Sequence, residues 1–219
     1  MTIVSFASPG YEKYQKLLHE NCHRFNIKDF MYGEDWLKDT YAYQNHKDLF
    51  ASKRGFGFWA WKPLAILYAL DGTDLVCYCD CGIIFDADPS GILFGVDEVG
   101  VYTADINPGY PADPPHYLNH TWTKRDCFAL MSCDEEKYWN GLHVWAGTVV
   151  ITQKAKWFVE EWLRYALDRR IISDDPNVCG LPNLPQFKDH RHDQSILSLL
   201  CIKYAEHVKF LDPCFRDRP

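Results

Sequence analysis

The sequence lacks two features that would point to common partners. It has no apolar run of the about 20 residues that a membrane-spanning helix needs, so no membrane span is expected. It is also poor in cations, since 23 lysines and arginines against 30 aspartates and glutamates leave a net charge of −7. Nucleic-acid binding requires a basic surface, so this balance argues against a nucleic-acid partner. A small anionic ligand stays compatible, because it needs only a local cationic pocket.

Familiar phosphate-binding and secretion signals are missing as well. The chain contains neither the Gly-x-Gly-x-x-Gly loop of dinucleotide-binding folds nor the Gly-Lys-Ser/Thr of a P-loop. The opening residues 1–6 read directly as a strand and not as a signal peptide. Nine cysteines, several of them in apolar runs, then predict free thiols in a reducing compartment, and we expect a cytoplasmic location. Zinc on Cys77, Cys79 and Cys81 is not expected, because no second ligand pair follows.

What the sequence does contain is an alternation of strand and helix patterns over its whole length. The 219 residues suit one sizeable domain, so we expect a single domain over 1–219, on its own or as a unit of a longer polypeptide. Alternation of this kind predicts an α/β fold with a mostly parallel central sheet flanked by helices. The expected strands are 2–7, 27–32, 75–79, 99–103, 144–151 and 208–212. The expected helices are 11–25, 59 or 61–70, 154–167 and 196–204, with partial helix in 34–50 and loops over 105–120 and 173–188.

Asp80 stands at the most informative strand end. The apolar run 75–79 predicts a buried central strand that stops at Asp80, and Gly82 permits a sharp turn. Open α/β sheets bind ligands at the carboxyl ends of such strands. A plain turn cap is the alternative for Asp80 taken alone.

Two further clusters support a ligand site. Residues 54–63 pack two cations, two glycines and four aromatic residues into ten positions, and residues 190–195 place six polar residues at a helix start. Cations bind phosphates, a carboxylate holds a divalent metal, and a helix N-terminus favours negative charge. An aromatic core segment and a polar helix cap remain the simpler alternatives for these clusters.

Four motifs together carry a family resemblance. Arg54-Gly-x-Gly-Phe-Trp-x-Trp-Lys-Pro63, Tyr78-x-Asp-x-Gly82, Ala146-Gly147 and His192-Asp-Gln-Ser195 resemble the small GT-A glycosyltransferases of bacterial polysaccharide loci and of large algal viruses such as the chlorella viruses. The resemblance implies a Rossmann-like GT-A fold and a hexosyltransferase-type enzyme in glycan biosynthesis. Such an enzyme moves a sugar from a UDP-sugar to a glycan or glycoprotein acceptor with Mn²⁺ or Mg²⁺ as cofactor. A viral protein of this kind would act in the host cytoplasm.

The resemblance also assigns residues. Asp193 and Gln194 would be catalytic beside the sugar. The block His192-Asp-Gln-Ser195 resembles the one that retaining enzymes place near the anomeric carbon, so retention of configuration is expected. A glutamine is a poor nucleophile, which favours front-face attack over a covalent intermediate. Trp122 and Trp145 would shape the acceptor side. The expected contacts to the nucleotide-sugar are Phe6, Ala7, Arg54, Lys62, Asp80, Gly82 and His192.

The expected metal ligand is Asp80, but the motif is incomplete there. The sequence Asp80-Cys81-Gly82 has glycine where the second carboxylate of an Asp-x-Asp motif is expected. Asp86 and Asp88 are the second choice, and the further candidate ligands are His192, His207 and Asp212. The missing carboxylate keeps a second hypothesis open, a nucleotide-sugar or glycan binding module without catalysis.

Overall fold

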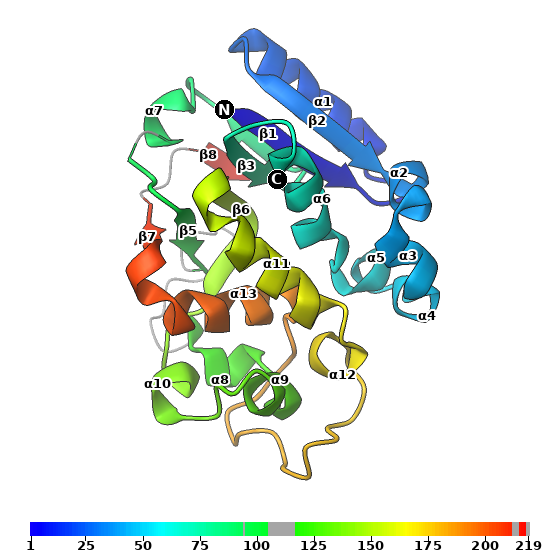
Figure 1. Ribbon diagram of the computed structural model, residues 1–219, viewed down its shortest axis with the longest axis vertical. Helices are drawn as coiled ribbons and strands as arrows, with labels where there is room; N and C mark the ends of the chain where they lie inside the picture. Colours follow the sequence, from blue (N-terminus) through cyan, green and yellow to red (C-terminus); the bar gives the residue numbers. More distant parts are fainter. Residues whose placement is uncertain (94, 105–116, 212–214, 218–219) are drawn as a thin grey trace.

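The computed structural model describes residues 1–93, 95–104, 117–211 and 215–217, and its centre is a six-stranded sheet (Figure 1). In spatial order the strands are β2 (Lys28–Gly33), β1 (Thr2–Ala7), β3 (Leu75–Cys79), β6 (Val144–Thr152), β5 (Val99–Thr103) and β7 (Val208–Phe210). Strand β6 pairs antiparallel with both neighbours, and the other pairings are parallel. A small antiparallel sheet joins β4 (Ile83–Phe85) to β8 (Phe215–Asp217). The mostly parallel sheet predicted from the sequence is confirmed.

Helices cover both faces of the sheet because alternate residues of a strand point to opposite sides. On β1, Val4 joins the core beneath α6 (Trp61–Leu70), α11 (Lys156–Ala166) and α13 (His192–Lys203). Its neighbour Ile3 joins the second core, which α1 (Glu12–Arg24) closes from the other face.

The remaining helices are short and surround this frame. They are α2 (Glu34–Asp39), α3 (Tyr41–Asn45), α4 (Lys47–Phe50), α5 (Gly55–Phe58), α7 (Ser90–Leu93), α8 (Asn119–Trp122), α9 (Arg125–Leu130), α10 (Glu136–Trp139) and α12 (Arg169–Ile172), with 3-10 turns at Gln153–Ala155 and Ala205–His207. Within the described ranges, no helix combines the length and apolar character needed to cross a bilayer.

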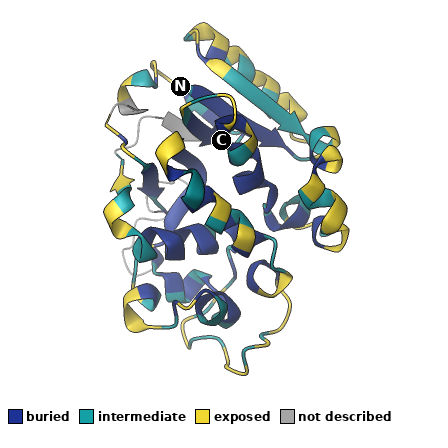
Figure 2. Ribbon diagram, in the orientation of Figure 1, coloured by how far each residue is buried: buried dark blue, intermediate teal, exposed yellow. Residues whose placement is uncertain are grey.

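One departure from the expected elements is the start of α13. The sequence predicts a helix from residue 196, whereas α13 begins at His192. Most of the helix is buried, including His192, Asp193 and Ser195 of its first turn (Figure 2). Ser195 Oγ donates to the carbonyl of Trp122 at 2.7 Å, so a polar residue is satisfied inside the protein. Polar side chains that hydrogen-bond internally defeat a prediction based on apolar periodicity.

Two further expectations concern the cysteines and the loop over 105–120. Every described cysteine is a free thiol, and Cys77 Sγ lies 3.6 Å from Cys79 Sγ, which confirms that they share one face of β3. The predicted loop over 105–120 falls outside the described residues at 105–116.

Candidate functional site

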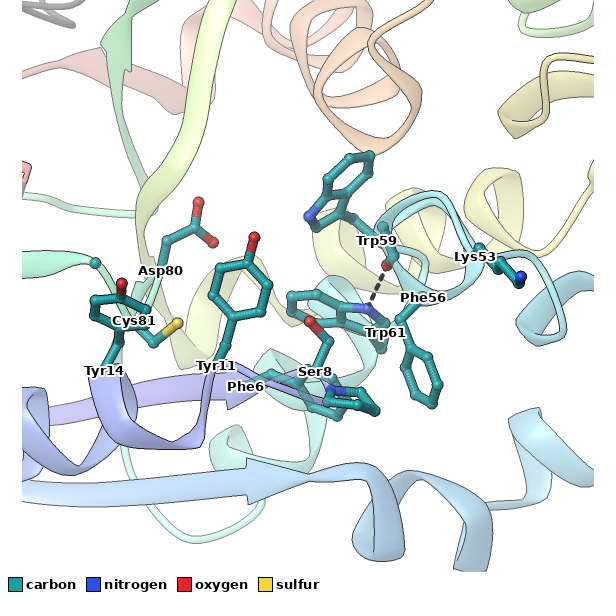
Figure 3. A pocket seen from close by; sticks show the side chains of 13 residues that line it. Phe6, Ser8, Tyr11, Tyr14, Lys53, Phe56, Trp59, Trp61, Asp80 and Cys81 are labelled. Carbon is teal, nitrogen blue, oxygen red and sulfur yellow. Dashed lines mark hydrogen bonds between the residues drawn. The ribbon is translucent and has the colours of Figure 1, made fainter. Parts of the chain in front are cut away.

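A cavity of about 610 Å³ opens where β1 and β3 end (Figure 3). Tyr11 and Asp80 lie on one side of it, and Trp59, Trp61 and Phe56 lie on the other. Aromatic walls of this kind suit a flat base or the apolar face of a sugar. The lining residues are Phe6, Ser8, Pro9, Tyr11, Tyr14, Lys53, Gly55, Phe56, Trp59, Trp61, Asp80, Cys81 and Gly82.

One wall of the cavity is a left-handed turn. The φ angle is positive at five consecutive residues, Gly55 to Trp59, with values of 56°, 51°, 90°, 56° and 60°. The left-handed conformation raises the conformational energy of a residue with a side chain by on the order of 1–2 kcal/mol. Three of the five residues have a side chain. The turn is braced by Trp61 Nε1, which donates to the Gly55 carbonyl at 3.0 Å. The strained backbone therefore lies at the cavity wall and directs the rings of Phe56 and Trp59 into it.

The glycines of this turn are required by space as well as by φ. A Cβ on Gly55 would lie 2.2 Å from the Trp59 ring, and a Cβ on Gly57 would lie 2.6 Å from the Phe50 ring. Both distances are far below van der Waals contact. The Gly-x-Gly pair in the sequence thus permits the backbone shape of this turn.

A buried lysine joins the two carboxylates that the sequence singled out. Lys62 Nζ lies 3.3 Å from Asp80 Oδ1 and 3.3 Å from Asp193 Oδ2, and it donates to the Ala146 carbonyl at 3.0 Å. Tyr78 Oη donates to the same Asp80 Oδ1 at 2.7 Å. These contacts tie α6, β3, β6 and α13 together at the carboxyl end of β3.

The three charged groups differ in how far solvent or a ligand can reach them. The Asp80 side chain is 40% exposed, whereas those of Lys62 and Asp193 are 4% exposed. Burial acts to lower the pKa of Lys62, but Asp193 and Asp80 outweigh it and the pKa stands above its ordinary value, so the amine is charged. Burial raises the pKa of Asp193 to about 7, although the nearby ammonium opposes the rise.

Gln194 faces a second, smaller cavity. It has a volume of about 170 Å³, and it is lined by Ala104, Tyr117, Trp122, His143, Trp145, Arg191 and Gln194. Burial lowers the pKa of His143 to about 3, so this imidazole is neutral. A chain of ion pairs therefore runs from Asp80 at the first cavity through Lys62 to Asp193, and the next residue in the sequence, Gln194, lines the second cavity.

Comparison with solved structures assigns this architecture. WbbM, a bifunctional glycosyltransferase, matches with a TM-score of 0.52 at 12% identity over 96% of this chain and 38% of its own. Mouse xyloside xylosyltransferase 1 matches with a TM-score of 0.50 at 9% identity over 97% and 85% of the two chains. The chain has a GT-A glycosyltransferase fold. No protein-family model and no curated protein sequence matches the chain.

This finding confirms the resemblance for the GT-A fold. A glycosyltransferase involved in the glycosylation of the major capsid of PBCV-1 also matches, at 14% identity over 99% of this chain and 92% of its own, with a TM-score of 0.45. At identities this low the likeness is one of fold, and the activity has to be argued from the site.

The main cavity is lined by only some of the residues that the sequence led us to expect around a nucleotide-sugar. Phe6, Asp80 and Gly82 line the main cavity, whereas Ala7 is buried beside it and is not part of its lining. His192 is buried with a φ of 52°, and its ring packs against those of Phe58 and Trp59 at centroid distances of 5.0 and 5.6 Å. His192 therefore supports the cavity wall from behind.

Arg54 and Lys53 are adjacent in the sequence but line different cavities. The Arg54 guanidinium bonds Asp174 at 3.2 Å and Asp189 at 2.6 Å, and it lines a different cavity of about 390 Å³. Lys53 is the one cation among the thirteen described residues around the main cavity. The sequence does not distinguish the two adjacent cations, because the difference lies in the contacts of Arg54 with distant residues.

A divalent metal fits the described residues around Asp80 poorly. Asp80 is the expected ligand, but its Oδ1 is already engaged by Tyr78 and Lys62, and position 82 is glycine. In the parts of the chain that the structure covers, no three His, Cys, Asp or Glu side chains group as metal ligands would. Asp86 and Asp88 are exposed and do not line the cavity. His207 is paired with Glu98 at 2.8 Å, and Asp212 lies outside the described residues.

Proposed function

We propose that the protein is a glycosyltransferase that moves a sugar from a UDP-sugar to a glycan or glycoprotein acceptor. The observation that carries the proposal is the chain of ion pairs from Asp80 through Lys62 to Asp193, because Asp80 lines an aromatic cavity and Gln194, next to Asp193, lines a second one. A transferase needs two such places, one for the donor and one for the acceptor, on either side of the reacting carbon. The GT-A fold supports this choice.

The donor would occupy the larger cavity. Its volume of about 610 Å³ is within the ordinary range of about 300–1,000 Å³ for small-molecule sites. Phe56 and Trp59 offer the base and ribose an apolar wall. Lys53 offers the diphosphate a positive charge, which lowers the energy of the departing UDP as negative charge develops on it.

The sugar would lie beside the buried charged groups. Asp80 is open to the cavity and can accept hydrogen bonds from sugar hydroxyls, and Lys62 fixes its orientation. Asp193 is held by the same ammonium and places the adjacent Gln194 at the second cavity. An amide is a weak nucleophile, so Gln194 favours front-face attack by the acceptor with retention of configuration over a covalent intermediate. The Trp122 and Trp145 rings would receive the acceptor.

The transfer described here does not depend on the divalent metal that the sequence led us to expect on Asp80. If Mn²⁺ or Mg²⁺ were bound, it would neutralise charge on the diphosphate.

A coupled assay of UDP release tests the proposal. Purified protein is incubated with a panel of UDP-sugars and glycan acceptors, and calorimetry measures the binding of each donor in parallel. We expect one UDP-sugar to be bound and turned over, with release accelerated by acceptor. Binding without turnover of any donor would favour the binding module, for which the deep burial of Asp193 is the supporting observation. Neither binding nor turnover would refute both.

A further inference from the structure

We propose that the Lys62 ammonium is a built-in cation that takes the place of a divalent metal between Asp80 and Asp193, so that the protein binds UDP without a metal. The part of this inference that concerns UDP rests on the proposed function. The part that concerns the cation depends only on the contacts of Lys62.

The Lys62 ammonium has three oxygen neighbours. Its Nζ donates to the Ala146 carbonyl at 3.0 Å and lies 3.3 Å from both Asp80 Oδ1 and Asp193 Oδ2, with which it forms ion pairs. The carboxylates come from the residue after β3 and from the start of α13, and the carbonyl comes from the third residue of β6. A lysine side chain has three N–H donors, which matches the number of oxygens around it.

The position of Lys62 in its helix points the same way. Lys62 lies in the first turn of α6, and the positive end of a helix dipole disfavours a cation there. Burial disfavours the charge as well. The ion pairs with Asp80 and Asp193 offset both costs, so the charge of Lys62 is explained by its pairing with these two carboxylates.

The same contacts discourage a metal on Asp80. Its Oδ1 already accepts from Tyr78 and faces Lys62. A divalent ion on the remaining oxygen would lie next to a buried ammonium that has the same sign of charge. Gly82 offers no side chain to hold the ion from the other side. The glycine at position 82 and the buried Lys62 therefore both disfavour a divalent metal on Asp80.

Direct measurement of Mn²⁺ binding by electron paramagnetic resonance tests this without any reaction. For the metal-free full chain, with and without UDP, we expect no stoichiometric site with a Kd below about 1 mM. We expect Lys62→Met, which leaves two carboxylates around an apolar side chain, to bind Mn²⁺ at least about tenfold more tightly than the wild type. Lys62→Arg, which keeps the charge, should not gain this binding.

One Mn²⁺ bound per wild-type chain and lost in Asp80→Asn would overturn the proposal. A folded Lys62→Met protein with wild-type Mn²⁺ affinity would also count against it. If that variant fails to fold, the wild-type titration still decides. UDP calorimetry in EDTA and in Mn²⁺ completes the test: we expect equal affinity, whereas affinity only with Mn²⁺ would refute metal-free binding while the transferase proposal stands. Absence of UDP binding under both conditions would refute the proposed function and not the role of Lys62 as a cation.

Discussion

The left-handed turn at the cavity wall gives a sharp prediction through Gly55→Ala. An alanine there must adopt a φ of +56°, which costs on the order of 1–2 kcal/mol. Its Cβ would also lie 2.2 Å from the Trp59 ring, and overpacking of this kind costs about 1–3 kcal/mol. The sum is a loss of about 2–5 kcal/mol in the free energy of unfolding.

The chain offers a matched control for the backbone part of this loss. Gly180 also has a positive φ, +80°, but nothing lies within 4 Å of the position of its Cβ. Gly180→Ala should therefore lose only the backbone cost. Urea unfolding gives the free energy of unfolding of both variants and so separates the cost of the clash from the cost of the backbone strain. Calorimetry with UDP measures whether the cavity still binds the nucleotide. We expect Gly55→Ala to weaken UDP binding by displacing Trp59, and Gly180→Ala to leave it unchanged. Equal losses of stability and equal UDP affinities in the two variants would refute this account of the turn.

Three further predictions concern the charged groups. Asp193→Asn and Gln194→Ala should lower the rate of sugar transfer by roughly 10²-fold, which is about 3 kcal/mol in barrier height. The affinity for UDP should change little, because these residues act on the sugar and not on the diphosphate. Wild-type rates in folded variants would show that Asp193 and Gln194 have only a structural role. If the ionised Asp193 carboxylate is the active form, kcat/KM should rise with pH through about 7, since the carboxylate loses its proton above its pKa, and a rise of the same shape in Asp193→Asn would assign the titration elsewhere. Lys53→Ala should weaken UDP binding by about tenfold, while Arg54→Ala, which removes ion pairs to Asp174 and Asp189, should leave UDP affinity unchanged in a calorimetric comparison; the opposite pattern would return the phosphate role to Arg54.

The sequence predicts the frame of the site well where local signals are strong. Strands β1, β3 and β5 have the bounds that their apolar runs indicate, because each run ends at a polar or turn-forming residue. Asp80 lies at the end of a buried strand, as the abrupt stop before Gly82 indicated. The local sequence pattern is therefore sufficient to predict where these strands end.

The rest depends on contacts between distant segments, which local pattern does not encode. The antiparallel direction of β6 is set by its partners β3 and β5. A Gly-x-Gly pair permits a left-handed turn but does not require one. Nothing local distinguishes Lys53 from Arg54, and nothing in the Trp-Lys-Pro motif shows that Lys62 is buried between carboxylates from β3 and α13.

The most direct test of the central claim is an NMR-monitored reaction of the full chain with the UDP-sugar panel and an oligosaccharide acceptor, run beside Gln194→Ala. The account predicts that one donor is consumed, that UDP and a glycosylated product of the same anomeric configuration as the donor appear together, and that Gln194→Ala slows both. An unchanged spectrum for every donor, from a protein whose fold is verified, would contradict the claim that this site transfers sugar.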